Sequence, residues 1–159
     1  MIYVYPYHCG NEMLRLCEYV DSDYGSYILY LDDDGNIMLP QYRNIVIQLD
    51  PLPKSLYVLF LYHPEGIELK NISDFREELE TIYRWVSRRN NPTVINRVID
   101  EITIPHNNTI YKNISIIRSA FYDVLPIAVA RHYIPLRRSG EDNLLTLDCT
   151  LVRQHVLLN

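Results

Sequence analysis

The apolar positions of the chain change their spacing near residue 50. Before it they alternate, as in Ile45, Ile47 and Leu49, and the β-prone segments MIYVYPY and SYILYLDDDGNIMLP precede them, the second with a glycine in its turn. This alternation predicts a small antiparallel sheet over residues 1–50 with one buried face. The segment NEMLRLCEYV fits either a short helix or another strand.

From Asp50 onward the apolar spacing is helical. The first predicted helix has Asp50 as its cap, Pro53 in its first turn and an end at His63-Pro64. Three further helices are predicted: one that follows Asn71 or Ser73 and stops near residue 90, a short one over 93–102, and one over 109–122 with Asn108 or Thr109 as its cap. Two strands, about 132–136 and 144–147, follow, joined by a polar loop that contains Gly140.

The segment 109–122 has two contrasting faces. Its apolar residues, together with the later Leu125, recur at steps of four, three, four and four and predict one buried stripe, made of Ile110, Ile114, Ile117, Phe121 and Leu125. The other face is polar and consists of Tyr111, Lys112, Ser115, Arg118, Ser119 and Tyr122. These side chains are of the kind that contact phosphates and base edges, although Arg118 is also placed to pair with Asp123 or Glu101.

Charge is distributed unevenly along the chain. The net charge of the 159 residues is −5, but residues 84–138 carry nine basic side chains against three acidic ones. A basic segment that coincides with an amphipathic helix indicates a surface for a phosphate backbone. The alternative is a solvated surface whose arginines pair with the acidic N-terminal half, and the negative total charge argues against strong non-specific binding of nucleic acid.

Motifs for catalysis, cofactors and metals are missing from the sequence. There is no Gly-rich phosphate loop, no nucleophile elbow and no zinc-protease motif, so we expect no catalytic residue, no cofactor and no enzyme activity. The spacing of Asp32, Asp34 and Asn36 begins like a calcium loop, but Ile37 and Arg43 stand where glycine and glutamate are needed, which favours a hairpin turn. His8, Cys9 and Cys17 lack the paired spacing of a zinc site, and we expect no metal.

Two helical segments of the chain resemble a known family. LPKSLYVLFLYHPEGIEL at 52–69 is similar to the first helix of the winged-helix effector domain of response-regulator transcription factors, and TIYKNISIIRSAF at 109–121 resembles the recognition helix of that domain. The family also has a four-stranded antiparallel sheet before its first helix and a C-terminal hairpin, the wing, so the likeness spans about residues 26–148. The chain is also similar to a group of bacterial proteins with an L-Y-x-L-F-L-x-H-P-E-G-I core, a likeness that implies no particular activity.

The resemblance implies an α+β, winged helix-turn-helix-like fold and a DNA-binding transcriptional regulator without a fused receiver domain. We expect one domain, with the N-terminal sheet at 1–50, a helical core at 51–128 and the wing hairpin at 129–150. The recognition helix 109–122 is expected to enter the major groove of double-stranded DNA. The wing arginines are expected to contact phosphates, with two further arginines flanking the patch; these five residues are Arg131, Arg137, Arg138, Arg88 and Arg89.

A second interpretation keeps the winged-helix-like fold but replaces DNA with a protein partner. A winged-helix-like domain with 14 tyrosines and an acidic sheet half also suits a protein–protein interaction module or a homodimer.

No window has the roughly 18 uncharged apolar residues of a membrane span, and the N-terminus lacks the pattern of a secretory signal. Three cysteines with no Cys-x-x-Cys pair favour a reducing compartment, so we expect a cytoplasmic protein without a membrane partner.

Overall fold

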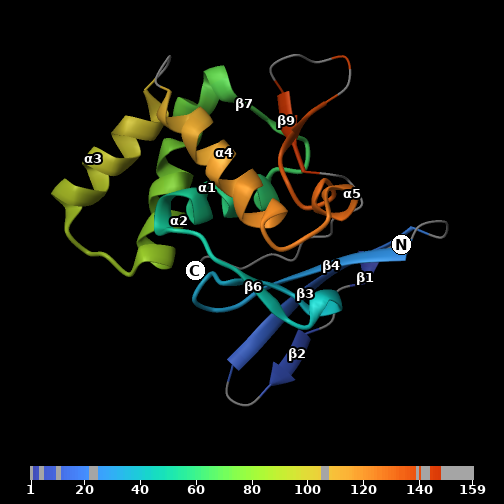
Figure 1. Ribbon diagram of the computed structural model, residues 1–159. Helices are drawn as coiled ribbons and strands as arrows, with labels where there is room; N and C mark the ends of the chain where they lie inside the picture. The colour runs from blue at the N-terminus through green and yellow to red at the C-terminus, as the bar shows by residue number, and fades with distance from the viewer. Residues whose placement is uncertain are drawn as a thin grey trace.

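The computed structural model describes residues 2–3, 6–9, 12–21 and 25–147, apart from 105–107, 139 and 141–143. Side chains are described for Tyr27 and, within the same limits, from Leu29 onward. An N-terminal antiparallel sheet lies below a group of helices, and a small second sheet lies beside the helices (Figure 1). The predicted α+β class with an N-terminal antiparallel sheet is therefore confirmed.

The N-terminal sheet is built around one long strand. Its strands are β1 (Ile2–Tyr3), β2 (Pro6–Cys9), β3 (Glu12–Asp21), β4 (Gly25–Leu31), β5 (Ile37–Leu39) and β6 (Ile45–Ile47). The strand order is β1-β3-β4-β5-β6, and β2 also pairs with β3. NEMLRLCEYV, which the sequence left open between helix and strand, forms most of β3, and β3 pairs with β4 over seven residues.

The segment DDDGN is the turn between β4 and β5, as predicted. The Asp32 carboxylate accepts hydrogen bonds from the backbone N–H groups of Asp34 and Asn36, at 2.9 and 2.7 Å. The indole N–H of Trp85 donates to the carbonyl oxygen of Asp33 at 2.7 Å. This turn therefore joins the sheet to the helical part of the molecule.

The described part of the chain contains five α-helices and two 3₁₀-helices. They are η1 (Pro40–Tyr42), α1 (Pro51–Tyr62), η2 (Leu69–Phe75), α2 (Arg76–Ser87), α3 (Pro92–Thr103), α4 (Thr109–Tyr122) and α5 (Ile127–Ala130). The predictions for α1, α3 and α4 are confirmed to within one or two residues at each end. Asn91 caps α3, because its side-chain oxygen accepts from the backbone N–H groups of Thr93 and Val94.

Two expectations about local structure are wrong. The second predicted helix begins later, at Arg76, because Leu69, Ile72 and Phe75 recur at steps of three and pack as the 3₁₀-helix η2. Most of the predicted strand at 132–136 is replaced by turns that continue α5, in which the backbone N–H of Tyr133 donates to the carbonyl of Ala130, and only Leu136 belongs to a strand. Tyr133 and Ile134 are both fully buried, so this segment enters the core instead of following a sheet edge.

The second sheet joins the region after α1 to the C-terminal hairpin. Its strands are β7 (Ile67–Glu68), β8 (Leu136–Arg137) and β9 (Leu144–Thr146), in the order β7-β9-β8 and all antiparallel. The C-terminal hairpin is thus present but shorter than predicted. Its predicted tip residues 139 and 141–143 lie outside the described residues.

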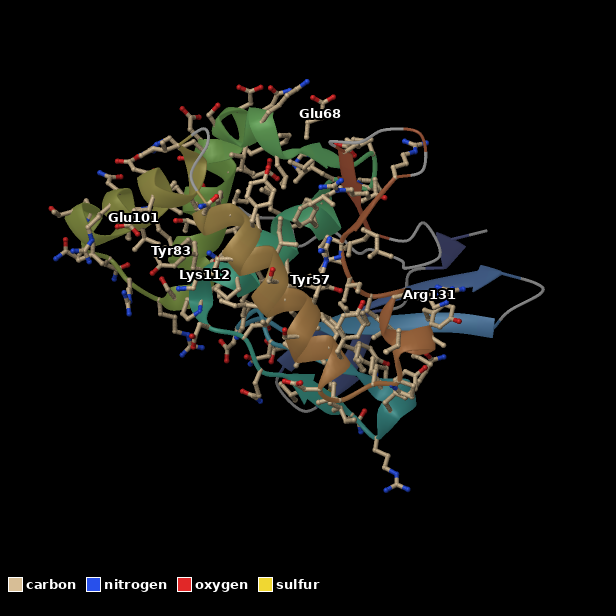
Figure 2. The ribbon with its side chains drawn as sticks, turned by 45° about the horizontal axis from the view of Figure 1, so that its top comes forward. Tyr57, Glu68, Tyr83, Glu101, Lys112 and Arg131 are labelled. Atoms are coloured by element: carbon tan, nitrogen blue, oxygen red, sulfur yellow. The ribbon has the colours of Figure 1, made fainter. Side chains whose placement is uncertain are left out.

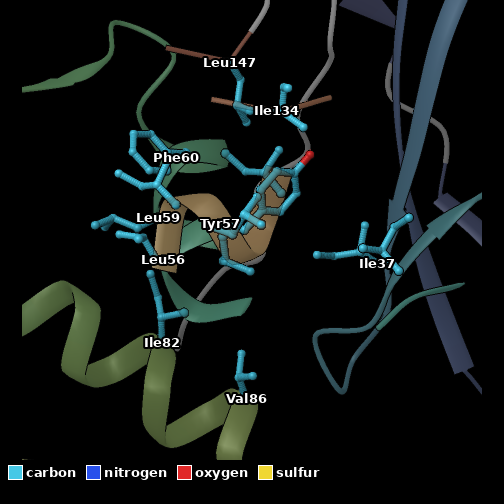
Figure 3. Packing of buried hydrophobic residues seen from close by; sticks show 14 of the residues in the cluster. Ile37, Leu56, Tyr57, Leu59, Phe60, Ile82, Val86, Ile134 and Leu147 are labelled. Carbon is cyan, nitrogen blue, oxygen red and sulfur yellow. The ribbon is translucent and has the colours of Figure 1, made fainter. Parts of the chain in front are cut away.

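Helix α1 is the centre of the hydrophobic core. Its residues from Ser55 to Leu61 are all buried, which a helix shows only when neighbours surround it. In Figure 3, Leu56, Tyr57 and Phe60 of α1 lie between Ile82 of α2 and Ile134. One continuous set of buried residues therefore extends from Leu29 in the sheet to Leu147 beyond β9.

Candidate functional site

The outer face of α4 carries the predicted polar residues. Five of the six residues predicted for this face are exposed: Tyr111, Lys112, Ser115, Ser119 and Tyr122. The opposite face is buried and consists of Ile110, Asn113, Ile114, Ile117 and Phe121. Helix α4 packs on α1 and α3 through this buried face, which leaves the polar face outward (Figure 2).

Arg118, the sixth residue, is half-buried and has a partner in the chain. Its Nε and Nη2 atoms donate hydrogen bonds to the main-chain carbonyl oxygen of Pro135, at 3.1 and 2.9 Å. Among the described residues no ion pair joins Arg118 to Asp123 or Glu101, the partners considered from the sequence. Arg118 therefore links α4 to the residue that immediately precedes β8.

This contact fixes which side of α4 faces the hairpin. Residues 111, 115, 118 and 122 are spaced by four, three and four and form one stripe on the helix. Because Arg118 reaches Pro135, the stripe lies on the side of β8. The exposed Arg137 and Arg138 follow Pro135 after one residue, Leu136, so the Arg118 contact attaches the start of the hairpin to this side of α4.

On its other side the hairpin is held by β7, the third strand of the second sheet. The Arg138 backbone N–H donates to the carbonyl of Leu144 at 3.0 Å, and β9 pairs in turn with β7. Gly66, in the turn before β7, lies so close to β9 that a Cβ atom there would be 2.6 Å from Thr146 Cγ2. Arg131, predicted for the wing, lies instead in the exposed turn after α5 (Figure 2).

Arg88 and Arg89 lie at the C-terminus of α2, outside α4 and the hairpin. Arg88 has a left-handed backbone conformation, with φ of 55°, and its guanidinium forms an ion pair with Asp34 in the β4–β5 turn. Arg89 is exposed. The structure therefore gives Arg88 a contact with the sheet, next to the Trp85 hydrogen bond.

Part of the basic charge of residues 84–138 is paired internally. Arg84 forms an ion pair with Glu80 at 2.8 Å, and Arg76 pairs with both Glu80 and Asp100. The hydrogen bond from Arg84 lowers the pKa of Glu80, and the charge of Arg84 and a second contact from Arg76 act in the same direction against the effect of burial. The alternative raised from the sequence, arginines paired with acidic residues, thus holds for Arg84 and Arg88.

Sequence reasoning missed a group of exposed apolar residues around α4. Ile116 lies on the outer face of α4, and further exposed apolar residues are Val124, Ile127 and Leu136. Ile127 is the most exposed of them, at 74%. The exposure of Ile116 could have been predicted from the segment SIIRS. Ile117 belongs to the buried stripe, and Ile116 is one residue out of register with it.

Comparison with known proteins gives no further assignment: no protein-family model, curated protein or solved structure matches the chain. Within the described residues, no three or more His, Cys, Asp or Glu side chains gather in a way that would hold a metal ion. No helix in the same part of the chain has the length and apolar character needed to cross a membrane. Cys9, Cys17 and Cys149 are among the residues whose side chains are not described.

Proposed function

We propose that this protein is a winged-helix-type DNA-binding transcriptional regulator. Helix α4 is the recognition helix, and the β8–β9 hairpin is the wing. The observation that carries the proposal is the Arg118–Pro135 contact, because it joins a helix with an outward polar face to a hairpin that carries two exposed arginines, Arg137 and Arg138. A helix in the major groove with an adjacent hairpin on the backbone needs this arrangement.

The side chains divide into two groups by their chemistry. Lys112, Ser119 and the two tyrosines of the stripe, Tyr111 and Tyr122, would face the groove and its base edges. Arg131, Arg137 and Arg138 are exposed and would neutralise phosphates. Arg84 and Arg88 already pair with carboxylates, so we assign them no DNA contact.

The test is fluorescence anisotropy with labelled mixed-sequence duplex DNA at several salt concentrations. The wild-type protein should bind with an affinity that falls steeply as salt increases, since each neutralised phosphate contributes about 0.9 to the log–log slope. Lys112→Ala should weaken binding. Arg97→Ala is the matched control, because Arg97 is an exposed cation on α3 that belongs neither to the polar face of α4 nor to the hairpin, and its removal should leave the affinity unchanged.

A second function is favoured by the exposed apolar residues near α4. Ile116, Tyr122, Val124 and Ile127 would suit a protein partner in place of DNA. Binding through such a surface weakens little with salt, whereas DNA binding through arginines weakens strongly. Absence of DNA binding even at low salt would overturn the DNA proposal and favour this second function.

A further inference from the structure

The guanidinium of Arg118 is committed to the protein backbone. Two of its donors, Nε and Nη2, converge on one carbonyl oxygen, that of Pro135, and Pro135 itself is buried. An arginine that reads guanine uses two donors at once on O6 and N7. In Arg118 the edge formed by Nε and Nη2 is already occupied by Pro135, so it is not available for such a contact.

The contact also fixes one end of an edge strand. Among the described residues β8 pairs with β9 alone, so in this part of the chain one side of β8 has no strand beside it. Pro135 precedes β8 directly, and its attachment to α4 defines how far Arg137 and Arg138 lie from the helix. The other attachment of the hairpin, from β9 to β7, does not involve α4.

We propose that Arg118 is a positioning residue that sets the spacing between α4 and the hairpin, so that the arginines of the hairpin reach phosphates while α4 occupies the groove. This inference rests on the proposed function. It assigns Arg118 no base contact, in contrast to the role that its position on the outer face of the helix implied.

A double-mutant cycle with salt dependence tests the DNA part of the inference. Removal of Arg137 and Arg138 together should lower the salt slope by roughly two, since each phosphate contact contributes about 0.9. Arg118→Ala should lower the slope by a similar amount by displacing the hairpin, and the triple variant should bind within about twofold of the Arg137/Arg138 double variant, because residues that act through each other are not additive.

Other roles for Arg118 give different results in the same cycle. A direct phosphate contact would lower the slope by about 0.9 and add fully to the loss from the hairpin variants. A base contact would leave the slope unchanged and reduce discrimination between sequences. Arg118→Lys is informative as well, because it keeps the charge but loses the planar fork: rescue of the slope by lysine would contradict the positioning role.

A measurement without DNA tests the structural part. Amide hydrogen exchange of Arg138, whose N–H donates to Leu144, should become roughly tenfold faster in Arg118→Ala, because the loss of a charge-assisted hydrogen bond frees the start of β8. Arg97→Ala should leave this exchange unchanged. Unchanged exchange in Arg118→Ala would overturn the positioning role alone, whereas a wild-type protein that binds no DNA would overturn the proposed function and the DNA role of Arg118 with it.

Discussion

The phenolic O–H of Tyr57 donates a 2.6 Å hydrogen bond to the main-chain carbonyl oxygen of Tyr133. Both residues are fully buried, and 76 positions separate them in the sequence. The ring of Phe121 is close to both, with its centroid 5.2 Å from that of Tyr57 and 6.0 Å from that of Tyr133. Helix α1, the end of α4 and the segment before the hairpin therefore meet at one point.

We expect Tyr57→Phe to lower the free energy of unfolding by about 1–3 kcal/mol, because the carbonyl of Tyr133 loses this donor inside the core while the ring packing stays. Urea denaturation of the two proteins measures the difference. Tyr111→Phe is the control: the ring is 55% exposed, and its change should stay within about 0.5 kcal/mol. Equal losses from the two substitutions would show that the buried hydrogen bond adds nothing to stability.

The sequence predicts the helices well where one apolar stripe decides the fold. The bounds of α4 follow from the spacing of Ile110, Ile114, Ile117 and Phe121, since this spacing fits a helix and no strand. The strand predicted at residues 132–136 is wrong, because Tyr133 is held in the core by Tyr57 and by ring contacts with Tyr27 and Tyr42. Such contacts are tertiary and leave no periodic signal.

In the candidate site, too, helical periodicity was predictable from the sequence and tertiary contacts were not. Exposure of the polar residues of α4 follows from helical periodicity, so it was predictable. The partner of Arg118 was not, because Pro135 is 17 residues away and offers only a backbone carbonyl, which any residue has. The pairing of Arg88 with Asp34 across 54 residues was hidden for a related reason: charge counts show that acidic partners exist but not which arginines find them.

Gly66 and Gly140 provide a matched pair of substitutions at the hairpin. Both have positive φ, 97° and 86°, so alanine at either position should cost about 1 kcal/mol from the backbone alone. A Cβ atom at residue 66 would also meet Thr146 Cγ2 at 2.6 Å and Leu144 Cγ at 2.9 Å, whereas no atom of the described residues lies within 4 Å of one at residue 140. We expect Gly66→Ala to cost roughly 1–3 kcal/mol more than Gly140→Ala in thermal unfolding. Equal costs would mean that β9 moves away from the turn freely.

His63 should make stability depend on pH. Its Nδ1 lies 2.7 Å from the Glu65 carboxylate and its Nε2 2.8 Å from that of Glu78, an arrangement in which both ring nitrogens donate only when the ring is protonated. Burial by itself lowers the pKa of His63, but the hydrogen bonds to Glu65 and Glu78 and their charges outweigh it, and the net pKa is raised. The stabilisation that protonated His63 provides is therefore fully present below the pKa of histidine in the unfolded chain, about 6.5. It is lost as the pH rises through the pKa of His63 in the folded protein.

The measurement is the free energy of unfolding of wild type and His63→Gln between pH 5.5 and 8.5. The difference between them should be larger at the acidic end, by no more than about 1 kcal/mol, because Glu65 is exposed and solvent screens its charge. The comparison with His63→Gln removes the contributions of the other four histidines. Parallel profiles for the two proteins would exclude a titrating link between α1 and α2.

Alanine substitutions at Arg88 and Arg137 distinguish an arginine that contacts the protein itself from one that we propose contacts DNA. Each is exposed and each substitution by alanine removes one positive charge. Arg88→Ala should change stability by less than about 0.5 kcal/mol, since a solvent-exposed ion pair contributes little, and should leave the salt slope of DNA binding unchanged. Arg137→Ala should lower that slope by about 0.9. A fall of the same size for Arg88→Ala would make Arg88 a DNA-binding residue, as the sequence predicted.

Ser119 is the residue of α4 on which we expect sequence discrimination to depend most clearly. Its hydroxyl is exposed, whereas that of Ser115 donates to the carbonyl of Tyr111 at 3.0 Å.

The measurement compares the affinity for duplexes selected from a randomised pool for tight binding with the affinity for mixed-sequence DNA. Ser119→Ala should weaken binding to the selected sequence about fivefold, the loss of one hydrogen bond to a base edge, and leave binding to mixed DNA unchanged. Lys112→Ala, which removes a positive charge from the same face, should weaken binding to both duplexes, because the attraction of this charge to the DNA phosphates does not depend on sequence. Equal losses on both duplexes for Ser119→Ala would mean that α4 does not read the sequence through this residue.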